Sequence, residues 1–287
     1  MLVRRIGPNP VALESTLLLH GVPRGDAPGL AADLDAVIRA RGATPALVAV
    51  VAGVPTVGVT GAELAALLAA SDVPKANTSN LGLLMHRRAH AATTVSATME
   101  LAAMAGVRVF ATGGLGGVHR GLTARPDISA DLGAFTRFPV AVVCAGVKGL
   151  LDVEGTRELL ESLGVCVIGF GSDQFPAFYR RASAARVDVR IDDVGELAGF
   201  VRAELARTGR GIVVANPIPP EHEIAEADWN RWLAEANVGL KSDGRDATPA
   251  LLARLHMVSG GATLRANLAL VRANADLAAR LAAHLGE

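Results

Sequence analysis

Three lysines stand in a chain whose positive charge comes mostly from arginine: Lys75, Lys148 and Lys241. A shortage of lysine is typical of a GC-rich source, which favours arginine codons. Arginine stays protonated in proteins, however, whereas a lysine can lose its proton and attack a carbonyl carbon. The remaining lysines are therefore candidates for chemistry that arginine cannot perform.

Lys148 follows the most apolar run of the chain, residues 138–147, so we expect it at the end of a buried strand. Burial disfavours the charged form of an amine. Imine chemistry at neutral pH needs a pKa lowered from ~10.4 to ~7.5, which takes about 4 kcal/mol of differential interaction. A snorkelling or salt-bridged lysine is the alternative interpretation, and the residues alone favour it.

Glu14 is an acid inside the apolar, strand-like run at 11–20. Carboxylates are rarely buried without a partner. A buried glutamate with a raised pKa is a competent general acid. A glutamate held in an ion pair is the alternative interpretation.

Asp127 and Asp131 flank Ser129. Such a pair could be a helix N-cap followed by a first-turn acid. It could also hold sugar hydroxyls or a divalent ion, because one or two carboxylates plus waters suffice for Mg²⁺ or Mn²⁺.

The glycine-rich segment at 113–121 follows a predicted strand. It has neither the G-x-G-x-x-G order of a dinucleotide-binding fold nor the Gly-Lys-[Ser/Thr] ending of a Walker A loop. Clustered glycines can aim backbone N–H groups at a phosphate. A tight strand-to-helix crossing would use glycines as well.

Strand-like and helical patterns alternate along the chain and must position these residues. The alternation predicts an α/β fold, a three-layer α/β/α sandwich with a largely parallel or mixed central sheet, in one domain at 1–287. Ligands bind such folds at the carboxyl ends of strands. We predict strands at 46–51, 56–60, 107–112, 140–144, 165–170, 187–191 and 212–215. We predict helices at 29–41, 62–70, 95–104, 154–163, 194–207, 226–236, 248–258 and 264–285.

Composition narrows the class of protein. The 28 basic and 28 acidic residues balance, which disfavours binding of nucleic acid through phosphate neutralisation. Cys144 and Cys166 lie in apolar runs and give no metal or disulfide spacing. The N-terminus lacks the apolar stretch of a secretory signal, and no span of about 20 apolar residues in helical register occurs. We therefore expect a cytoplasmic protein with no nucleic-acid or membrane partner.

Motifs spread along the chain resemble those of the pseudouridine-5′-phosphate glycosidase family, also called indigoidine synthase A-like. The longest is Val-Phe-Ala-Thr-Gly-Gly-Leu-Gly-Gly-Val-His-Arg-Gly at 109–121. The motifs are collinear from about residue 10 to the last helix, so the resemblance covers nearly the whole chain. The others lie at 12–16, 20–21, 92–98, 127–132, 144–148, 214–219, 248–249 and 264–267.

The resemblance implies a homotrimer with one divalent ion per site, Mn²⁺ or else Mg²⁺, and chemistry on a phosphoribosyl C-glycoside. It implies Lys148 as the Schiff-base nucleophile, Glu14 as the general acid/base and Asp127 as the metal ligand. Lys241 lies near a family lysine and receives no catalytic role. The matching substrate-binding positions are Lys75, Val95, Thr112, Gly113, Gly114, His119, Ser129, Ala130, Asp131 and Asn267.

The segment at 76–90 departs from the family pattern. Relatives carry Arg-[Asp/Glu]-[Leu/Ile]-Pro after the substrate lysine, whereas this chain reads Ala-Asn-Thr-Ser-Asn-Leu-Gly at 76–82. We expect an enzyme that makes or breaks the bond between C1 of ribose 5-phosphate and a ring carbon. The departure slightly favours a biosynthetic C-glycosynthase with an aromatic, polyketide-type acceptor. Cleavage of pseudouridine 5′-phosphate to uracil and ribose 5-phosphate is one alternative, and a non-catalytic sugar-phosphate binding protein is another.

Overall fold

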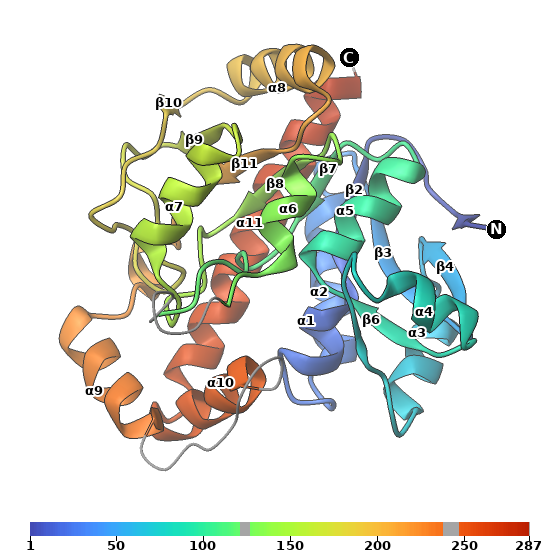
Figure 1. Cartoon of the computed structure of the whole chain (residues 1–287), viewed down its shortest axis with the longest axis horizontal. Coiled ribbons are helices and arrows are strands. Elements are labelled where there is room, and N and C mark those ends of the chain that lie inside the picture. Colours follow the sequence, from blue (N-terminus) through green and yellow to red (C-terminus); the bar gives the residue numbers. More distant parts are fainter. Residues whose placement is uncertain (121–126, 238–246, 287) are drawn as a thin grey trace.

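The computed structural model of the chain describes residues 1–120, 127–237 and 247–286. Its centre is a mixed, mostly parallel sheet with the strand order β1-β4-β3-β2-β7-β8-β11-β9-β10 (Figure 1). Only β3 pairs antiparallel among the described strands, with β4 and with β6. The strands are β1 (Val3–Arg4), β2 (Pro10–Glu14), β3 (Thr44–Val51), β4 (Val54–Val57), β5 (Lys75–Ala76), β6 (Ala91–Thr93), β7 (Val109–Ala111), β8 (Ala141–Cys144), β9 (Val167–Phe170), β10 (Val189–Ile191) and β11 (Ile212–Ala215).

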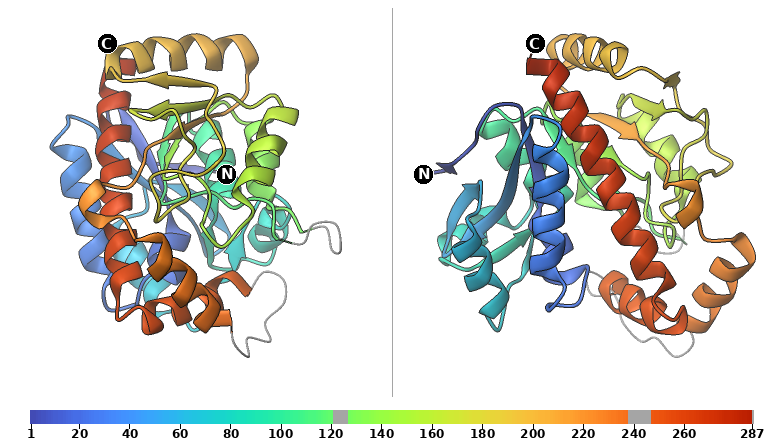
Figure 2. Two further views of the ribbon diagram at one scale, coloured as in Figure 1. Left: turned by 90° about the vertical axis from the view of Figure 1, so that its left-hand side faces the viewer. Right: turned by 180° about the vertical axis from the view of Figure 1, so that it is seen from behind.

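Helices cover both faces of the sheet, which confirms the predicted layered α/β fold. Helices α2, α8 and α11 lie on one face, and α5, α6 and α7 lie on the other (Figures 1 and 2). The helices are α1 (Ser15–His20), α2 (Ala27–Arg39), α3 (Gly61–Ala69), α4 (Leu81–His86), α5 (Val95–Met104), α6 (Ala130–Phe135), α7 (Val153–Ser162), α8 (Val194–Thr208), α9 (Glu226–Asn237), α10 (Ala247–Val258) and α11 (Ala262–Gly286), with a 3-10 turn at Pro220–His222.

Two apolar cores sandwich the sheet, because successive strand side chains point to opposite faces. In β8, Ala141 and Val143 join the core beneath α11, while Val142 and Cys144 join the core beneath α5 and α6. Both faces of the central strands are thus covered, which explains why their sequences are apolar without alternation.

The 25-residue helix α11 is the longest element described. It crosses the back of the sheet and packs against α2, α8, β7, β2 and β8 (Figure 2, right). Its buried side includes two asparagines, Asn267 and Asn274, among alanines and leucines. This packing brings the end of the chain to the strands that carry the candidate site.

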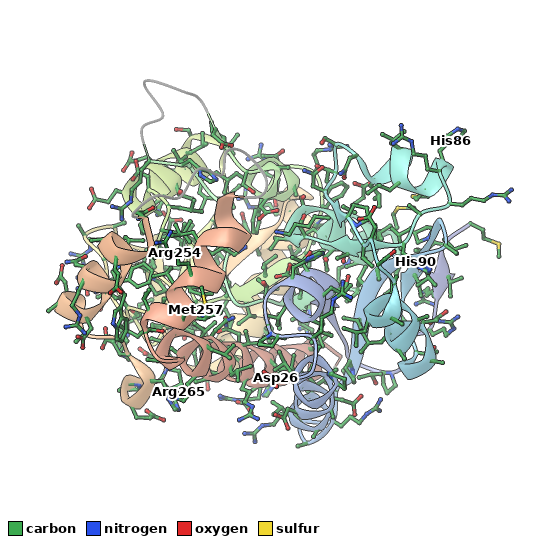
Figure 3. All side chains as sticks on the ribbon, turned by 90° about the horizontal axis from the view of Figure 1, so that it is seen from below. Asp26, His86, His90, Arg254, Met257 and Arg265 are labelled. Atoms are coloured by element: carbon green, nitrogen blue, oxygen red, sulfur yellow. The ribbon has the colours of Figure 1, made fainter. Side chains whose placement is uncertain are left out.

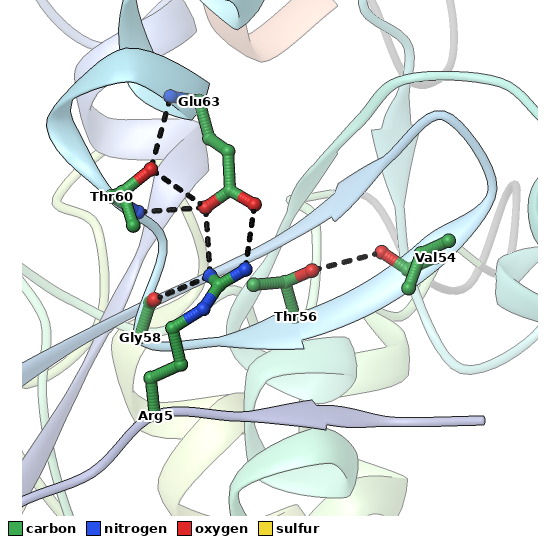
Figure 4. A network of polar contacts seen from close by, with 6 residues as sticks. All are labelled: Arg5, Val54, Thr56, Gly58, Thr60 and Glu63. Atoms are coloured by element: carbon green, nitrogen blue, oxygen red, sulfur yellow. Dashed lines mark hydrogen bonds and ion pairs between the residues drawn. The ribbon is translucent and has the colours of Figure 1, made fainter.

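A polar network fixes the sheet edge where β1 meets β4 (Figure 4). The Thr60 hydroxyl accepts the Glu63 backbone N–H at 3.3 Å, and the Glu63 carboxylate accepts the Thr60 N–H at 2.8 Å. This reciprocal pair is a capping box at the start of α3. Arg5 adds two hydrogen bonds to the same carboxylate, at 2.9 and 3.0 Å, and so joins β1 to α3.

Helix α1, which follows β2, lies between α10 and α4 when the molecule is seen from below (Figure 3). His86 and His90 mark the α4 side, and Arg254 and Met257 mark the α10 side (Figure 3). Within the described residues, no helix combines the length and the apolar character needed to cross a membrane.

Candidate active site

A cleft of about 460 Å³ lies at the carboxyl ends of the strands. It brings together residues from β2, β5, α5, α6 and the loops after β7 and β8. Nine of the predicted site residues line it: Glu14, Lys75, Val95, His119, Asp127, Ser129, Ala130, Asp131 and Lys148. Residues separated by more than a hundred positions therefore face one cavity.

Glu14 ends β2 and directly precedes α1. It is 8% exposed, and its Oε1 accepts a short hydrogen bond from the Thr112 hydroxyl. Burial raises the pKa of the Glu14 carboxyl above its usual value, although the nearby Lys148 and the Thr112 hydrogen bond act in the opposite direction. The neutral form that a proton donor needs is thereby favoured.

Lys148 lies in the turn after β8 and is half-buried. The strand ends at Cys144, as predicted, although the apolar run continues to residue 147, and the chain then turns at Gly146 with a φ of 74°. A Cβ at this glycine would lie 1.9 Å from the Pro176 carbonyl oxygen, so only glycine fits. The Lys148 backbone N–H then donates to Leu115 O at 3.1 Å, which fixes the lysine beside the glycine-rich loop.

Asp131 is 5% exposed, and both of its carboxylate oxygens accept backbone N–H groups. Oδ1 accepts from Ser96 at 3.0 Å in the first turn of α5, and Oδ2 accepts from Gly116 at 2.9 Å. The carboxylate therefore ties α5 to the glycine-rich loop. The N-cap of α6 is Ser129, so the interpretation of Asp127 as an N-cap is wrong.

The first two glycines of the loop lie behind the cleft rather than on its surface. A Cβ on Gly114 would lie 2.5 Å from the Phe178 ring, and Gly113 O accepts the Ala145 N–H at 2.9 Å. Asn267 lies against Gly113, and its buried Oδ1 has no hydrogen-bond partner in the described structure. Of the predicted site residues, four do not line the cleft: Thr112, Gly113, Gly114 and Asn267.

The rest of the described segment, residues 115–120, packs closely against neighbouring elements. Leu115 and Val118 are buried, and a Cβ on Gly117 would lie 2.3 Å from the Thr156 hydroxyl oxygen. Residues 113–120 lie between β7 and α6, and α6 begins only at Ala130, so the crossing to the next described helix is not a tight one. Gly116 reaches the cleft. Gly121 and Lys241 lie outside the described residues.

Asp127 and His119 stand together at the mouth of the cleft. Asp127 Oδ2 lies 4.0 Å from His119 Nδ1, and the Asp127 side chain is 45% exposed. No group of three or more His, Cys, Asp and Glu residues able to hold a metal occurs in the described part of the chain. The donors thus fit Mn²⁺ or Mg²⁺ held by one carboxylate with water and substrate oxygens, and they do not form a protein cage.

The prediction missed seven lining residues. Asn77 and Ser79 belong to the segment that departs from the family pattern, and this departure could have indicated that they line the site. The Asn77 side-chain oxygen accepts the backbone N–H groups of Ser79 at 3.0 Å and Asn80 at 3.2 Å, so a local turn shapes this wall. The other five missed residues are Thr16, Thr94, Gly116, Ile128 and Leu151.

Comparison with known proteins places the chain in one family. The profile described as "Indigoidine synthase A like protein" matches residues 7–284. A "Pseudouridine-5′-phosphate glycosidase" of Nocardioides sp. is 46% identical, with 97% of this chain and 92% of that protein covered. A protein of the same name from Solibacter usitatus is 45% identical over 96% of this chain and 93% of that protein.

Solved structures show the same fold. The crystal structure of an indigoidine synthase A-like protein from Thermotoga maritima has a TM-score of 0.93 and 34% identity, covering 100% of this chain and 97% of the other. The prealnumycin C-glycosynthase AlnA, solved in complex with ribulose 5-phosphate, has a TM-score of 0.88 and 31% identity, covering 96% and 91%. The chain belongs to the indigoidine synthase A-like family.

Proposed function

We propose that this chain is an enzyme that makes or breaks the C-glycosidic bond between C1 of ribose 5-phosphate and a carbon of an acceptor ring. One observation carries the proposal. The Lys148 amine and the buried Glu14 carboxyl line the same cleft and interact electrostatically. An imine-forming amine beside a carboxyl that favours its neutral form is the pair that this chemistry needs.

Lys148 is the nucleophile of the proposed reaction. In the bond-forming direction, its neutral amine attacks the C1 aldehyde of open-chain ribose 5-phosphate, and one water leaves as the imine forms. The nucleophilic ring carbon then attacks C1, and the imine nitrogen takes up the electron pair. The sugar 4-hydroxyl finally displaces the lysine amine from C1, which closes the ribose ring and regenerates Lys148.

Glu14 moves the proton of the acceptor ring. In bond formation its carboxylate removes the proton from the ring carbon that has joined C1. In cleavage the neutral carboxyl returns that proton to the departing ring carbon. Because a C-glycoside has no leaving oxygen to protonate, the paired-carboxylate scheme of O-glycosidases does not apply.

Asp127, with His119 nearby, is the proposed place for one divalent ion, Mn²⁺ or Mg²⁺. Such an ion would neutralise phosphate charge and help to orient the sugar. Lys75, Val95 and the backbone at 129–131 would complete the binding of the sugar phosphate. A homotrimeric assembly and a cytoplasmic location are further parts of this proposal and rest on the family resemblance.

The acceptor ring divides the proposal into two candidate functions. The relatives named pseudouridine-5′-phosphate glycosidases, with 45–46% identity for the two described above, support cleavage to uracil and ribose 5-phosphate. The likeness to the prealnumycin C-glycosynthase AlnA supports synthesis of a C-glycosidic bond. Asn77 and Ser79, which belong to the segment that departs from the family pattern, line the cleft. The departure therefore lies where an acceptor ring could be selected, and for this reason we retain the slight preference for synthesis.

Borohydride trapping tests the shared chemistry. The protein is incubated with ribose 5-phosphate and borohydride, digested and mapped by mass spectrometry. We expect a reduced pentose-phosphate adduct on Lys148 and none in Lys148→Arg, which keeps the charge but cannot form the imine. If bound ribose 5-phosphate gives no adduct, the protein is a sugar-phosphate binder instead. Turnover of pseudouridine 5′-phosphate then separates the two candidate functions.

A further inference from the structure

Asn274 is a fully buried amide on α11, at 0% exposure, in a helix face otherwise made largely of alanine, leucine and valine. It does not line the cleft and lies outside every motif that carried the family resemblance. Burying an amide without partners costs free energy, on the order of 1–3 kcal/mol for each unsatisfied group. The hydrogen bonds of Asn274 therefore indicate why an amide stands at this buried position.

The Asn274 side chain joins the ends of two strands. Its Nδ2 donates to Thr112 O at 2.8 Å and, at a longer 3.4 Å, to Gly113 O, directly after β7. Its Oδ1 accepts from Asn216 Nδ2 at 3.0 Å, directly after β11. The Asn216 backbone N–H in turn donates to Cys144 O at 2.8 Å, at the end of β8.

Thr112 connects this amide to the candidate proton donor. Its backbone carbonyl is held by Asn274, while its side-chain hydroxyl donates to Glu14 Oε1. Thr112 itself is 1% exposed and does not line the cleft. The position of the hydroxyl depends on the backbone that carries it, because a buried threonine has few alternative rotamers.

We propose that Asn274 is a positioning residue for the reaction: by holding the Thr112 carbonyl, it aims the Thr112 hydroxyl at Glu14 and so fixes the proton-donating carboxyl against the acceptor ring. The inference rests on the proposed role of Glu14. It gives Thr112 a role through Glu14 in place of the predicted substrate contact. Asn216 holds the other end of the amide and selects its orientation.

A double-mutant cycle between Asn274→Ala and Thr112→Val tests the link. Misplacing a catalytic group by about 1 Å can lower the rate about 100-fold. We expect Asn274→Ala to lower kcat about 10- to 100-fold while KM and borohydride trapping on Lys148 stay unchanged. In the Thr112→Val background, Asn274→Ala should have no further effect on kcat, because the hydroxyl through which it acts is gone.

Thr263→Val is the matched control. Thr263 is also fully buried and polar on α11, but its hydroxyl contacts His256 and Ser259 and not the strand ends. It should lower the melting temperature without changing kcat. Should Asn274→Ala fail to fold, Asn216→Ala probes the same link from its outer end, with a smaller fall in kcat expected.

The outcomes separate this inference from the proposed function. If Glu14→Gln is inactive while the effects of Asn274→Ala and Thr112→Val on kcat add, Asn274 is only a packing residue and the inference is overturned alone. Should Asn274→Ala raise KM and leave kcat unchanged, the same conclusion holds. If Glu14→Gln retains full turnover, the role of Glu14 and the inference fall together.

Discussion

The floor and the outer wall of the cleft are held in different ways. The floor, defined as Glu14, Asp131 and Lys148, is fixed by hydrogen bonds between distant parts of the chain. The Thr112–Glu14 bond joins positions 98 apart, and the Ser96–Asp131 bond joins positions 35 apart. The wall, defined as residues 77–79, is shaped by bonds from Asn77 to residues two and three positions ahead.

This difference indicates which part of the site can be substituted without disturbing the rest of the fold. The Glu14 and Asp131 side chains bond to other elements of the chain, and the Lys148 backbone bonds to the glycine-rich loop, so the floor cannot be altered as one local segment. A wall residue belongs to one exposed turn that can be rewritten without moving a strand. The bond chemistry can thus be retained while the acceptor changes. The following experiments test whether the floor and the wall have these separate roles.

Lys148→Ala should have the largest effect. Loss of a covalent nucleophile lowers kcat on the order of 10⁴-fold or more. Because the rest of the floor remains, binding of ribose 5-phosphate should persist in titration calorimetry. A variant that still turns over substrate would show that another group attacks C1.

Glu14→Gln should rank second, with kcat lowered about 10²- to 10⁴-fold and with the Lys148 adduct still trapped. It should also change the pH dependence of stability. Since burial raises the pKa of Glu14 in the folded state, its stabilising contribution is full below the unfolded pKa and is lost as pH rises through the folded value. Denaturant titrations over a pH range that begins at the ordinary glutamate pKa should therefore show the unfolding free energy of Glu14→Gln rising relative to that of the wild type as the pH increases. If the unfolding free energies of the two proteins differ by the same amount at the lowest and the highest pH, the Glu14 carboxyl is not desolvated.

Asp127→Asn tests the mouth of the cleft, between floor and wall. We expect Mn²⁺ binding to weaken by at least about 10-fold, because one carboxylate supplies the protein's charge at this place. Mn²⁺ titration followed by electron paramagnetic resonance measures this without any assay of turnover. Unchanged binding would place the ion elsewhere.

Ser79→Ala tests the wall. Ser79 lines the cleft, and its hydroxyl donates to the Asn77 side-chain oxygen at 2.8 Å, so we expect its free lone pairs to bond to the acceptor ring. Loss of one such hydrogen bond, about 1.4 kcal/mol, corresponds to about a 10-fold fall in kcat/KM for the preferred ring. Trapping of ribose 5-phosphate on Lys148 should not change, since the sugar is held by the floor. A fall in trapping would show that the wall also positions the sugar, and the floor and the wall would then not have separate roles.

Thr60→Ala should have the smallest effect and none on turnover. It removes the capping box of α3, which does not line the cleft, and should cost about 1 kcal/mol of unfolding free energy. Denaturant titration measures the loss, and an unchanged kcat serves as the control. A change in kcat would mean that the edge at β1 and β4 is coupled to the cleft.

The long elements could be predicted from the sequence because each has a clear period. All the predicted strands and helices are present with small shifts at their ends, and α5 occupies the predicted residues. The short elements were missed or misplaced: the strand-like run at 11–20 is strand β2 only up to Glu14 and helix α1 from Ser15, with no glycine or proline to mark the change. Strands as short as β5 and β6 give no period to detect.

The site could be predicted only in part. Glu14, Asp127, Asp131 and Lys148 were identified because their residue types suggest chemistry. Asn274 could not be, since a single asparagine in an alanine-rich helix gives no sign of what it contacts. That information depends on how α11 packs across β2, β7 and β8, which local sequence does not encode.

The position of α11 has a consequence for synthesis of the chain on the ribosome. Helix α11 is made after β2, β7 and β8, yet it covers these strands, which lead to Glu14 and Lys148. A nascent chain can form earlier helices and pair neighbouring strands, but one face of its central sheet stays uncovered until α11 has been made. A chain whose synthesis stops before α11 would thus expose an apolar sheet and become a substrate for proteolysis rather than a weakened enzyme.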